Sequence, residues 1–168
     1  DVLVDLGVED GRLKWPNDVW IKASKLAGIL VELANQGSST VVIIGVGLNL
    51  ALKPEERAAV DQPIVDLRSR GVTLDRNSLL MLFVKKIVTY LQHFEKSGFA
   101  PFRSAFDAVH LLHKQDILVH SANAGEATPS RGRVEGVGDS GQLLIQTSSG
   151  IAEILGGEVS LRPAENIN

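Results

Sequence analysis

One long stretch of the chain, from Asp75 to Gly98, has the periodicity of an amphipathic helix, and strand-like sequence lies on both sides of it. Asp75 or Asn77 is suited to cap the start of this helix, and Gly98 is suited to end it. Its apolar residues recur at intervals of three and four, namely Leu80, Phe83, Val84, Ile87, Leu91 and Phe94. A helical middle between two strand-rich stretches predicts an α+β fold.

The first fifty residues predict strands. The segment RLKW forms a short strand that Pro16 ends, because proline has no N–H to donate to a neighbouring strand. The segments VWI and KLAGILVEL flank the polar KAS and predict an antiparallel hairpin. The run TVVIIGVGLNL, residues 40–50, has β-branched residues at odd and even positions, which predicts a central strand covered on both faces.

The chain continues with sequence that predicts two more helices and then changes to a pattern of short strands. PIVDLRSRG, residues 63–71, and APFRSAFDAVHLLHK, residues 100–114, have proline near their starts and predict helices. From Gln115 onward, about five short alternating strands are joined by turn residues, which is typical of a small SH3-like β-barrel. We therefore predict an α+β domain over residues 1–113 and a barrel domain over residues 114–168.

Composition narrows the classes of function. The net charge of −3 provides no overall basic field for nucleic acid, although a local basic patch stays open. The absence of cysteine excludes disulfides and thiolate chemistry. His110 and His113 are three apart but have no third metal-like companion, so we interpret them as a solvated helix face. No apolar segment is long enough for a membrane span.

The segment KWPND, residues 14–18, is the first candidate for a site. Pro16 turns the chain and leaves Asn17 and Asp18 to project, while the returning hairpin brings Lys25 and the Gly28 backbone close. A cation, a carboxylate and an amide near small residues suit an anionic group, bound directly or through a divalent metal on Asp18. Taken alone, this stretch is better explained as a capped turn with solvated lysines.

Glycines strengthen the case for a pocket. Gly28, Gly45 and Gly47 interrupt strand sequence, which marks a bulge or a place where a ligand approaches the backbone. GVGLN lacks the third glycine of a dinucleotide fingerprint. Asn49 can both donate and accept, which matches the edge of an adenine. Strand-end turn chemistry is the alternative, but two glycine-marked strands beside one polar turn favour a pocket.

Three segments in order, LKWPNDVWIKASKLAGILVEL, VVIIGVGLNL and GGEVSLRPAE, resemble the biotin protein ligases, especially the bacterial bifunctional ligase/repressor type. DRNSLL and FEKSGFAPF, at the two ends of the long helix, match as well, so the resemblance runs from about Arg12 to Glu165. It implies part of a catalytic domain like that of class II aminoacyl-tRNA synthetases, with a mixed sheet and packed helices, followed by the SH3-like barrel.

The resemblance implies a two-step reaction. Biotin and ATP with Mg2+ give biotinyl-5′-adenylate, and biotin then passes to a lysine of the biotin carboxyl carrier domain of acetyl-CoA carboxylase. By resemblance Lys25 is the catalytic lysine, which contacts the biotin carboxylate and the α-phosphate. Asp18 is then a candidate to bind metal or to orient the carrier lysine. The other residues implied are Lys14, Trp15 and Asn17 for the nucleotide or adenylate, Gly28, Leu30, Gly45 and Gly47 beside biotin, Asn49 for adenine, and Glu158 and Arg162 for ATP or domain-interface contacts.

The family's arginine- and glycine-rich loop is expected upstream of residue 1, so the chain resembles the C-terminal half of a cytoplasmic ligase and is expected to lack full activity alone. In the bifunctional type a winged-helix DNA-binding domain is expected upstream too, and DNA would be bound only through it. In that type the sheet that contains the strand GILVEL pairs across a two-fold axis, so the resemblance implies a homodimer through this strand, whose alternating residues offer an edge for pairing. The alternatives are a biotin-operon repressor that senses the adenylate, a lipoate-type acyl ligase, and an inactive fragment that binds a partner.

Overall fold

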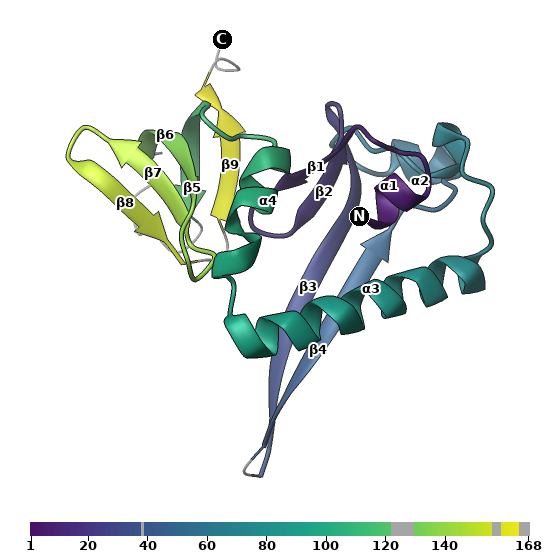
Figure 1. Cartoon of the computed structure of the whole chain (residues 1–168). Coiled ribbons are helices and arrows are strands. Elements are labelled where there is room, and N and C mark those ends of the chain that lie inside the picture. Colours follow the sequence, from purple (N-terminus) through teal and green to yellow (C-terminus); the bar gives the residue numbers. More distant parts are fainter. Residues whose placement is uncertain (38, 122–129, 156–158, 165–168) are drawn as a thin grey trace. The chain divides into compact units, whose positions relative to one another are not determined.

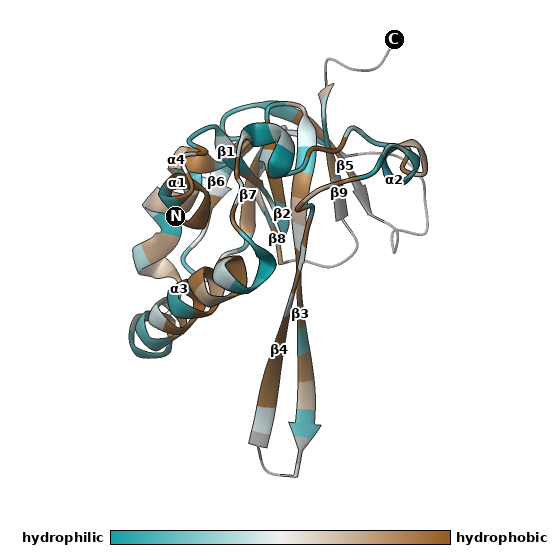
Figure 2. Ribbon diagram, turned by 90° about the vertical axis from the view of Figure 1, so that its right-hand side faces the viewer, coloured by the Kyte–Doolittle hydropathy of each residue, from teal (hydrophilic) through white to brown (hydrophobic). Residues whose placement is uncertain are grey.

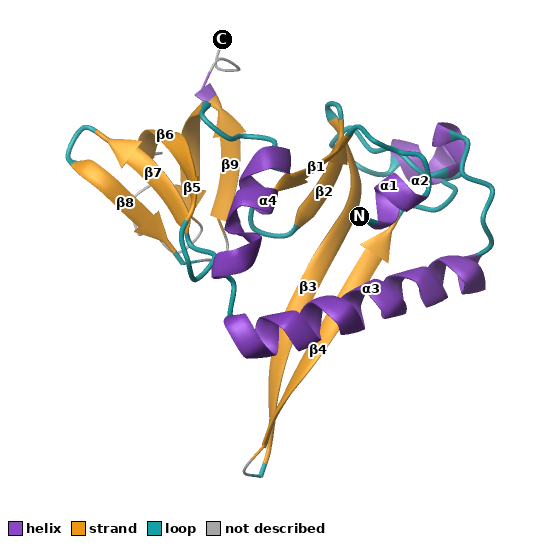
Figure 3. Ribbon diagram, viewed as in Figure 1, coloured by secondary structure: helices purple, strands orange, loops and turns teal. Residues whose placement is uncertain are grey.

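The computed structural model describes residues 1–37, 39–121, 130–155 and 159–164 (Figure 1). The chain forms two compact units, Asp1–Thr89 and Tyr90–Asn168. Each contains helices and its own antiparallel sheet, which confirms the α+β fold class (Figure 3). The domain boundary after residue 113 stays a prediction. No helix in the described part of the chain is long and apolar enough to cross a membrane.

The first unit is built on a four-stranded sheet in the order β1-β2-β3-β4. All of its strand pairs are antiparallel, and an isolated bridge between Lys25 and Ile64 adds a parallel pairing. Its elements are α1 (Val2–Asp5), β1 (Gly11–Lys14), β2 (Asp18–Ile21), β3 (Ser24–Gln36), β4 (Ser39–Leu48), α2 (Pro54–Ala58), the 3-10 turn η1 (Arg68–Arg70) and the first part of α3 (Arg76–Ser97).

The strand β4 departs from the prediction that it is central and covered on both faces. In the described sheet it is an edge strand paired with β3 alone, and the two form a long ribbon. Val42 and Ile43 point to opposite faces and are 53% and 50% exposed. Figure 2 shows hydrophobic residues along most of β4. The β-branched residues correctly predicted a strand. They do not determine which other elements pack against its two faces.

The core of the first unit lies where the β2–β3 hairpin meets the start of α3. Ile21, Leu26, Leu67 and Leu79 are buried together there. Asp75 caps α3 as predicted, because its carboxylate accepts the N–H groups of residues 77 and 78 at 2.9 and 3.1 Å. The apolar periodicity of α3 is only partly a core face: Phe83 packs against the cluster, while Leu80, Val84, Leu91 and Phe94 are exposed.

The helix predicted over residues 63–71 is wrong. Ile64 lies in an extended segment bridged to Lys25, and only Arg68–Arg70 makes a 3-10 turn, which Gly71 ends with a φ of +83°. Proline at position 63 does suit a first helical turn. However, tertiary hydrogen bonds to the Lys25 backbone hold Pro63 and Val65 extended, and they override the local preference.

The second unit carries a five-stranded antiparallel sheet in the order β8-β7-β6-β5-β9. The helix predicted over residues 100–114 is shorter, since a 3-10 turn precedes α4, which ends at Val109. Within the described residues β8 and β9 are edge strands, so closure into a barrel stays a prediction. Its elements are the rest of α3, η2 (Ala100–Phe102), α4 (Arg103–Val109), β5 (Asp116–Ser121), β6 (Ser130–Val137), β7 (Leu143–Thr147), β8 (Gly150–Ile154) and β9 (Val159–Pro163).

The prediction of a solvated histidine face is wrong for His110. This residue caps the C-terminal end of α4 and is only 5% exposed, with its ring centroid 5.4 Å from that of Phe106. Neither ring nitrogen has a hydrogen-bond partner among the residues that the structure describes. Burial therefore lowers the pKa of His110 to about 4, although the nearby Asp107 carboxylate acts in the opposite direction.

Candidate active site

The β2–β3 hairpin brings a lysine and a carboxylate together. Asp18 pairs with Gly28 across the two strands, and a β-bulge beside Trp20 shifts the register so that Trp20 faces Lys25. The Lys25 Nζ lies 2.6 Å from Asp18 Oδ1, with both side chains partly buried. The turn predicted from KWPND therefore does place a cation and an anion in direct contact.

An open pocket of about 500 Å³ surrounds this ion pair. Across the β3–β4 ribbon, Gly28 pairs with Gly47 and Leu30 with Gly45, so three of these four positions carry no side chain. A Cβ added at Gly28 would lie 3.5 Å from both Asp18 Oδ1 and Lys25 Nζ. The glycines thus leave a backbone floor beside the charges, as their placement in the strands predicted. The lining residues are Asn17, Asp18, Lys25, Gly28, Ile29, Leu30, Gly45, Val46 and Gly47.

Asn17 ties the turn to the ribbon. Its side-chain Nδ2 donates to the Ile29 carbonyl at 2.9 Å, and the Ile29 N–H donates to the Asn17 carbonyl at 2.8 Å. The Trp15–Pro16 peptide bond immediately before it is cis. The two hydrogen bonds fix one wall of the pocket, so Asn17 has a structural role there whatever ligand it meets.

Three of the predicted site residues in the first unit lie outside the pocket lining. The Lys14 Nζ sits 4.9 Å from the centre of the Trp20 ring, in a cation–π contact. Trp15 is buried. The side-chain Nδ2 of Asn49 donates to the Lys25 and Val65 carbonyls at 3.3 and 3.1 Å. The adenine contact of Asn49 stays a prediction, and its amide hydrogens already have partners within the protein.

The two residues predicted near the end of the chain belong to the second unit. Arg162 is exposed on β9, where it pairs with Leu118 of β5. Glu158 lies outside the described residues. Their predicted contacts with ATP or a domain interface stay predictions.

The described residues contain no group of three or more histidines or carboxylates placed to hold a metal ion. Asp18 supplies a single carboxylate at the pocket, and its Oδ1 is already bound by Lys25. Mg2+ is often bound by one or two carboxylates together with water and substrate phosphates. The site therefore fits a metal that arrives with a phosphate-bearing ligand better than one held by protein alone.

Sequence reasoning missed two kinds of residue. Ile29 and Val46 face each other across the ribbon and help to line the pocket, and their positions beside the glycines were the available signal. Asp66, which is buried, forms an ion pair with the partly exposed Arg57, and Arg57 also donates to the carbonyl of Ile64, which is bridged to Lys25. The spacing of Asp66 and Ser69, which resembles a helix-capping pattern, was the signal there.

Comparison with known proteins gives the same family in both units. Residues 8–49 match the model of the Biotin/lipoate A/B protein ligase family, and residues 123–162 match the Biotin protein ligase C terminal domain. The bifunctional ligase/repressor BirA of Escherichia coli is 34% identical over 98% of this chain and 50% of its own length. The biotin–[acetyl-CoA-carboxylase] ligase of Paracoccus denitrificans is 31% identical over 88% of this chain and 61% of its own length.

Solved structures agree with this assignment. The match to the apo biotin protein ligase of Aquifex aeolicus covers 97% of this chain and 70% of that enzyme's chain, at 28% identity and a TM-score of 0.81. The same enzyme in complex with biotin and ATP gives 27% identity, coverages of 97% and 66%, and a TM-score of 0.79. This chain spans about half the length of the E. coli relative. Together with the lysine–aspartate pair on its glycine floor, these matches show that the chain belongs to the biotin protein ligase family.

Proposed function

We propose that this protein activates biotin with ATP to biotinyl-5′-adenylate and transfers the biotinyl group to a lysine of a biotin carboxyl carrier domain. The observation that carries the proposal is the contact of Lys25 with Asp18 over a floor of three glycines, inside the segment that matches the ligase family model. The Aquifex aeolicus enzyme solved with biotin and ATP, which shares this fold, supports the choice of ligands.

In the first step a carboxylate oxygen of biotin attacks the α-phosphorus of ATP, and the bond from that phosphorus to the bridging oxygen breaks to release pyrophosphate. Both reactants are anions, so they repel each other as they approach. The Lys25 ammonium has three donors and a compact charge, which can offset that repulsion and the charge that develops at phosphorus. The bare backbone at Gly28 and Gly47 leaves room for both reactants beside it.

In the second step the neutral amine of the carrier lysine attacks the acyl carbon, an amide forms, AMP leaves and the amine loses a proton. We propose that Asp18 orients that incoming amine, since its carboxylate lies at the pocket and accepts from the Lys25 ammonium. When bound with ATP, Mg2+ would neutralise phosphate charge, and Asp18 is the pocket residue that can supply it with one oxygen ligand.

The test is Lys25→Ala in the protein at its natural full length. We expect kcat for biotin-dependent exchange of pyrophosphate into ATP to fall about 100-fold or more, because a donor aimed at developing charge is lost. Thermal stability should change little, because the ion pair with Asp18 is partly exposed. Lys85→Ala, which removes an exposed lysine from α3 of the same unit, is the matched control and should keep full activity.

An unchanged exchange rate in folded Lys25→Ala would remove Lys25 from the mechanism. If the protein forms an adenylate from lipoate or octanoate and not from biotin, the proposed substrate is wrong and the proposed adenylation chemistry stands.

We also propose a homodimer through β3. No feature of the residues that the structure describes favours repression, the second role in the name of the E. coli relative, so that role stays the alternative.

A further inference from the structure

The backbone of Lys25 is held by a segment far away in the sequence. Its N–H donates to the Pro63 carbonyl at 2.9 Å, and its carbonyl accepts the Val65 N–H at 3.0 Å. The same carbonyl also accepts from the Asn49 side chain. Since the β-bulge beside Lys25 interrupts the regular β2–β3 pairing, these bonds supply the support for the residue that carries the ammonium.

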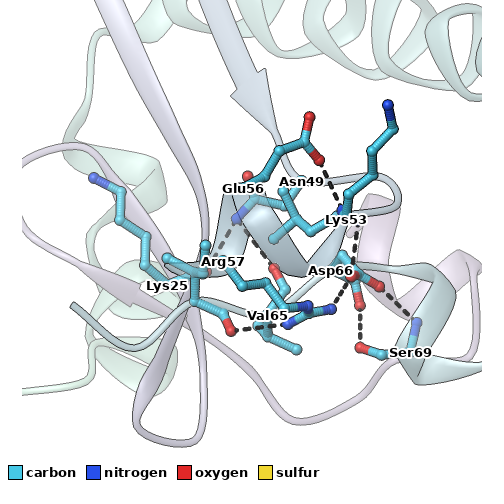
Figure 4. A network of polar contacts seen from close by, with 10 residues as sticks. Lys25, Asn49, Lys53, Glu56, Arg57, Val65, Asp66 and Ser69 are labelled. Atoms are coloured by element: carbon cyan, nitrogen blue, oxygen red, sulfur yellow. Dashed lines mark hydrogen bonds and ion pairs between the residues drawn. The ribbon is translucent and has the colours of Figure 1, made fainter. Parts of the chain in front are cut away.

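That supporting segment is anchored in turn by one buried carboxylate. Asp66 is 2% exposed and accepts the N–H groups of Ser69 at 2.7 Å and Leu52 at 3.1 Å. It also forms an ion pair with Arg57 of α2. Figure 4 shows these contacts converging on Asp66, while the Lys25 side chain points away from the network that holds its backbone.

The electrostatics of Asp66 fit an anchor. Burial on its own would raise the pKa of this carboxyl group. The hydrogen bonds from Ser69 and Leu52 and the charge of Arg57 outweigh burial and hold the pKa below its usual range. Asp66 is therefore ionised at neutral pH and joins three segments: the chain after β4, helix α2 and the turn η1.

We propose that Asp66 is a positioning residue for Lys25, which acts by fixing the extended segment 63–65 against the Lys25 backbone so that the ammonium stays directed at the pocket. The role rests on the proposed function of Lys25, and Asp66 is outside the pocket lining. Displacement of a reacting group by about 1 Å can cost about 100-fold in rate, so an anchor this far from the chemistry can still control it.

Asp66→Asn is the sharpest change, because it keeps the shape of the side chain. Asp66 Oδ2 accepts from Leu52 N–H and Arg57, and Oδ1 accepts from Ser69 N–H, so the NH2 group of an asparagine would face a donor in either orientation of its amide. We expect hydrogen exchange at the Lys25 and Val65 amides to speed up about 10- to 100-fold, as for the loss of a charged hydrogen bond. The Leu79 amide, bound to the Asp75 carbonyl in α3, is the reference and should change much less.

The kinetic readout separates positioning from folding. In the full-length protein we expect Asp66→Asn to lower kcat for pyrophosphate exchange about 10- to 100-fold and to leave KM for biotin within about threefold. Asp10→Asn is the matched control, because it breaks another carboxylate–arginine pair of this unit, with Arg70 at 2.8 Å. It should leave both the Lys25 amide and kcat unchanged.

Unchanged exchange at Lys25 and Val65 overturns the proposal, and so does an equal rise at all amides with activity lost only in proportion to unfolded protein. Selective exchange at Lys25 with full activity in both Asp66→Asn and Lys25→Ala supports the anchor and overturns the catalytic role of Lys25. Should Asp66→Asn fail to fold, Arg57→Gln tests the same anchor from its exposed side, with exchange at Lys25 expected to rise about 3- to 10-fold.

Discussion

Gly28 lies directly beside the ion pair of Lys25 and Asp18. It pairs with Asp18 on one side and with Gly47 on the other, and a Cβ there would be in ordinary van der Waals contact with the ion pair. Its φ does not lie in the left-handed region, so the chain conformation tolerates a side chain. Since the backbone does not require glycine here, we infer that Gly28 leaves space for the proposed ligand.

This makes Gly28→Val a test of the pocket. The valine methyl groups would enter the space beside Lys25, so we expect the Kd for biotin to rise about tenfold or more, as for other overpacked sites. Valine suits a strand, so the free energy of unfolding should stay within about 1 kcal/mol. Calorimetry gives the first quantity and urea denaturation the second.

Ala34→Val is the control for that test, because Ala34 lies on the same strand and the same face, outside the pocket lining. It should bind biotin normally. Equal affinity in Gly28→Val and the unmodified protein would mean that the ligand does not occupy the glycine floor.

At the residue scale, local spacing was enough to predict that Lys25 lies close to the turn that carries Asp18, because a hairpin returns the chain beside that turn. The direct ion pair was not predictable, since Asp18 pairs with Gly28 and a β-bulge shifts the register before Lys25. Spacing was not enough for Asn49. Its donors serve the carbonyls of Lys25 and Val65, and the second of these partners lies in a segment whose extended shape depends on Asp66. The hydrogen bonds of Asn49 join segments far apart in the sequence, so no local sequence pattern predicts them.

At the element scale, α3 and its cap were predictable because the signals are local: a carboxylate before the first turn and a glycine after the last. The segment 63–71 was not, since proline is equally suited to a first helical turn and to an extended stretch. The burial of His110 at the end of α4 was also not predicted, because the local sequence pattern continues to resemble a helix there. His110 lies in a helix-like pattern, but the chain leaves the helix there and packs its ring against Phe106.

His110 makes the stability of the second unit depend on pH. Its pKa is about 4 in the folded unit and about 6.5 in an unfolded chain, so the unfolded state binds a proton first as pH falls. Stability is therefore complete above pH 6.5 and is lost between pH 6.5 and 4, by roughly 3 kcal/mol in all. Among the groups around it, Asp107 opposes the shift and His113 adds to it.

His110→Leu should remove this part of the pH dependence. We expect the difference in unfolding free energy between pH 7.5 and pH 4.5 to shrink by about 2 kcal/mol or more relative to the unmodified chain. Urea titrations followed through NMR signals of β6 measure it, and His93→Gln, at an exposed histidine, is the control. An equal pH dependence in His110→Leu and the unmodified chain would mean that folding does not lower the pKa of His110.

At the scale of the whole molecule, the ribbon β3–β4 leaves large apolar side chains exposed on both faces. Exposed apolar patches of this kind mark surfaces that bind a partner or another copy. Residues 31–36 of β3 also have no ladder partner on the side away from β4 within the described part of the chain. The exposed members are Leu30, Val31, Leu33, Val41, Val42, Ile43 and Val46.

The homodimer proposed through β3 can be tested at Leu33, which is 71% exposed and opposes Val42 across the ribbon. Leu33→Lys puts a charge on the free edge and removes an apolar contact from each copy. Since burying one leucine contributes about 1.5–3 kcal/mol, we expect the dimer dissociation constant to rise at least tenfold. Sedimentation velocity over a range of concentrations measures it. Leu155→Lys, at a leucine that is 85% exposed in the second unit, should leave association unchanged. A monomer at every concentration in the unmodified protein would refute the dimer.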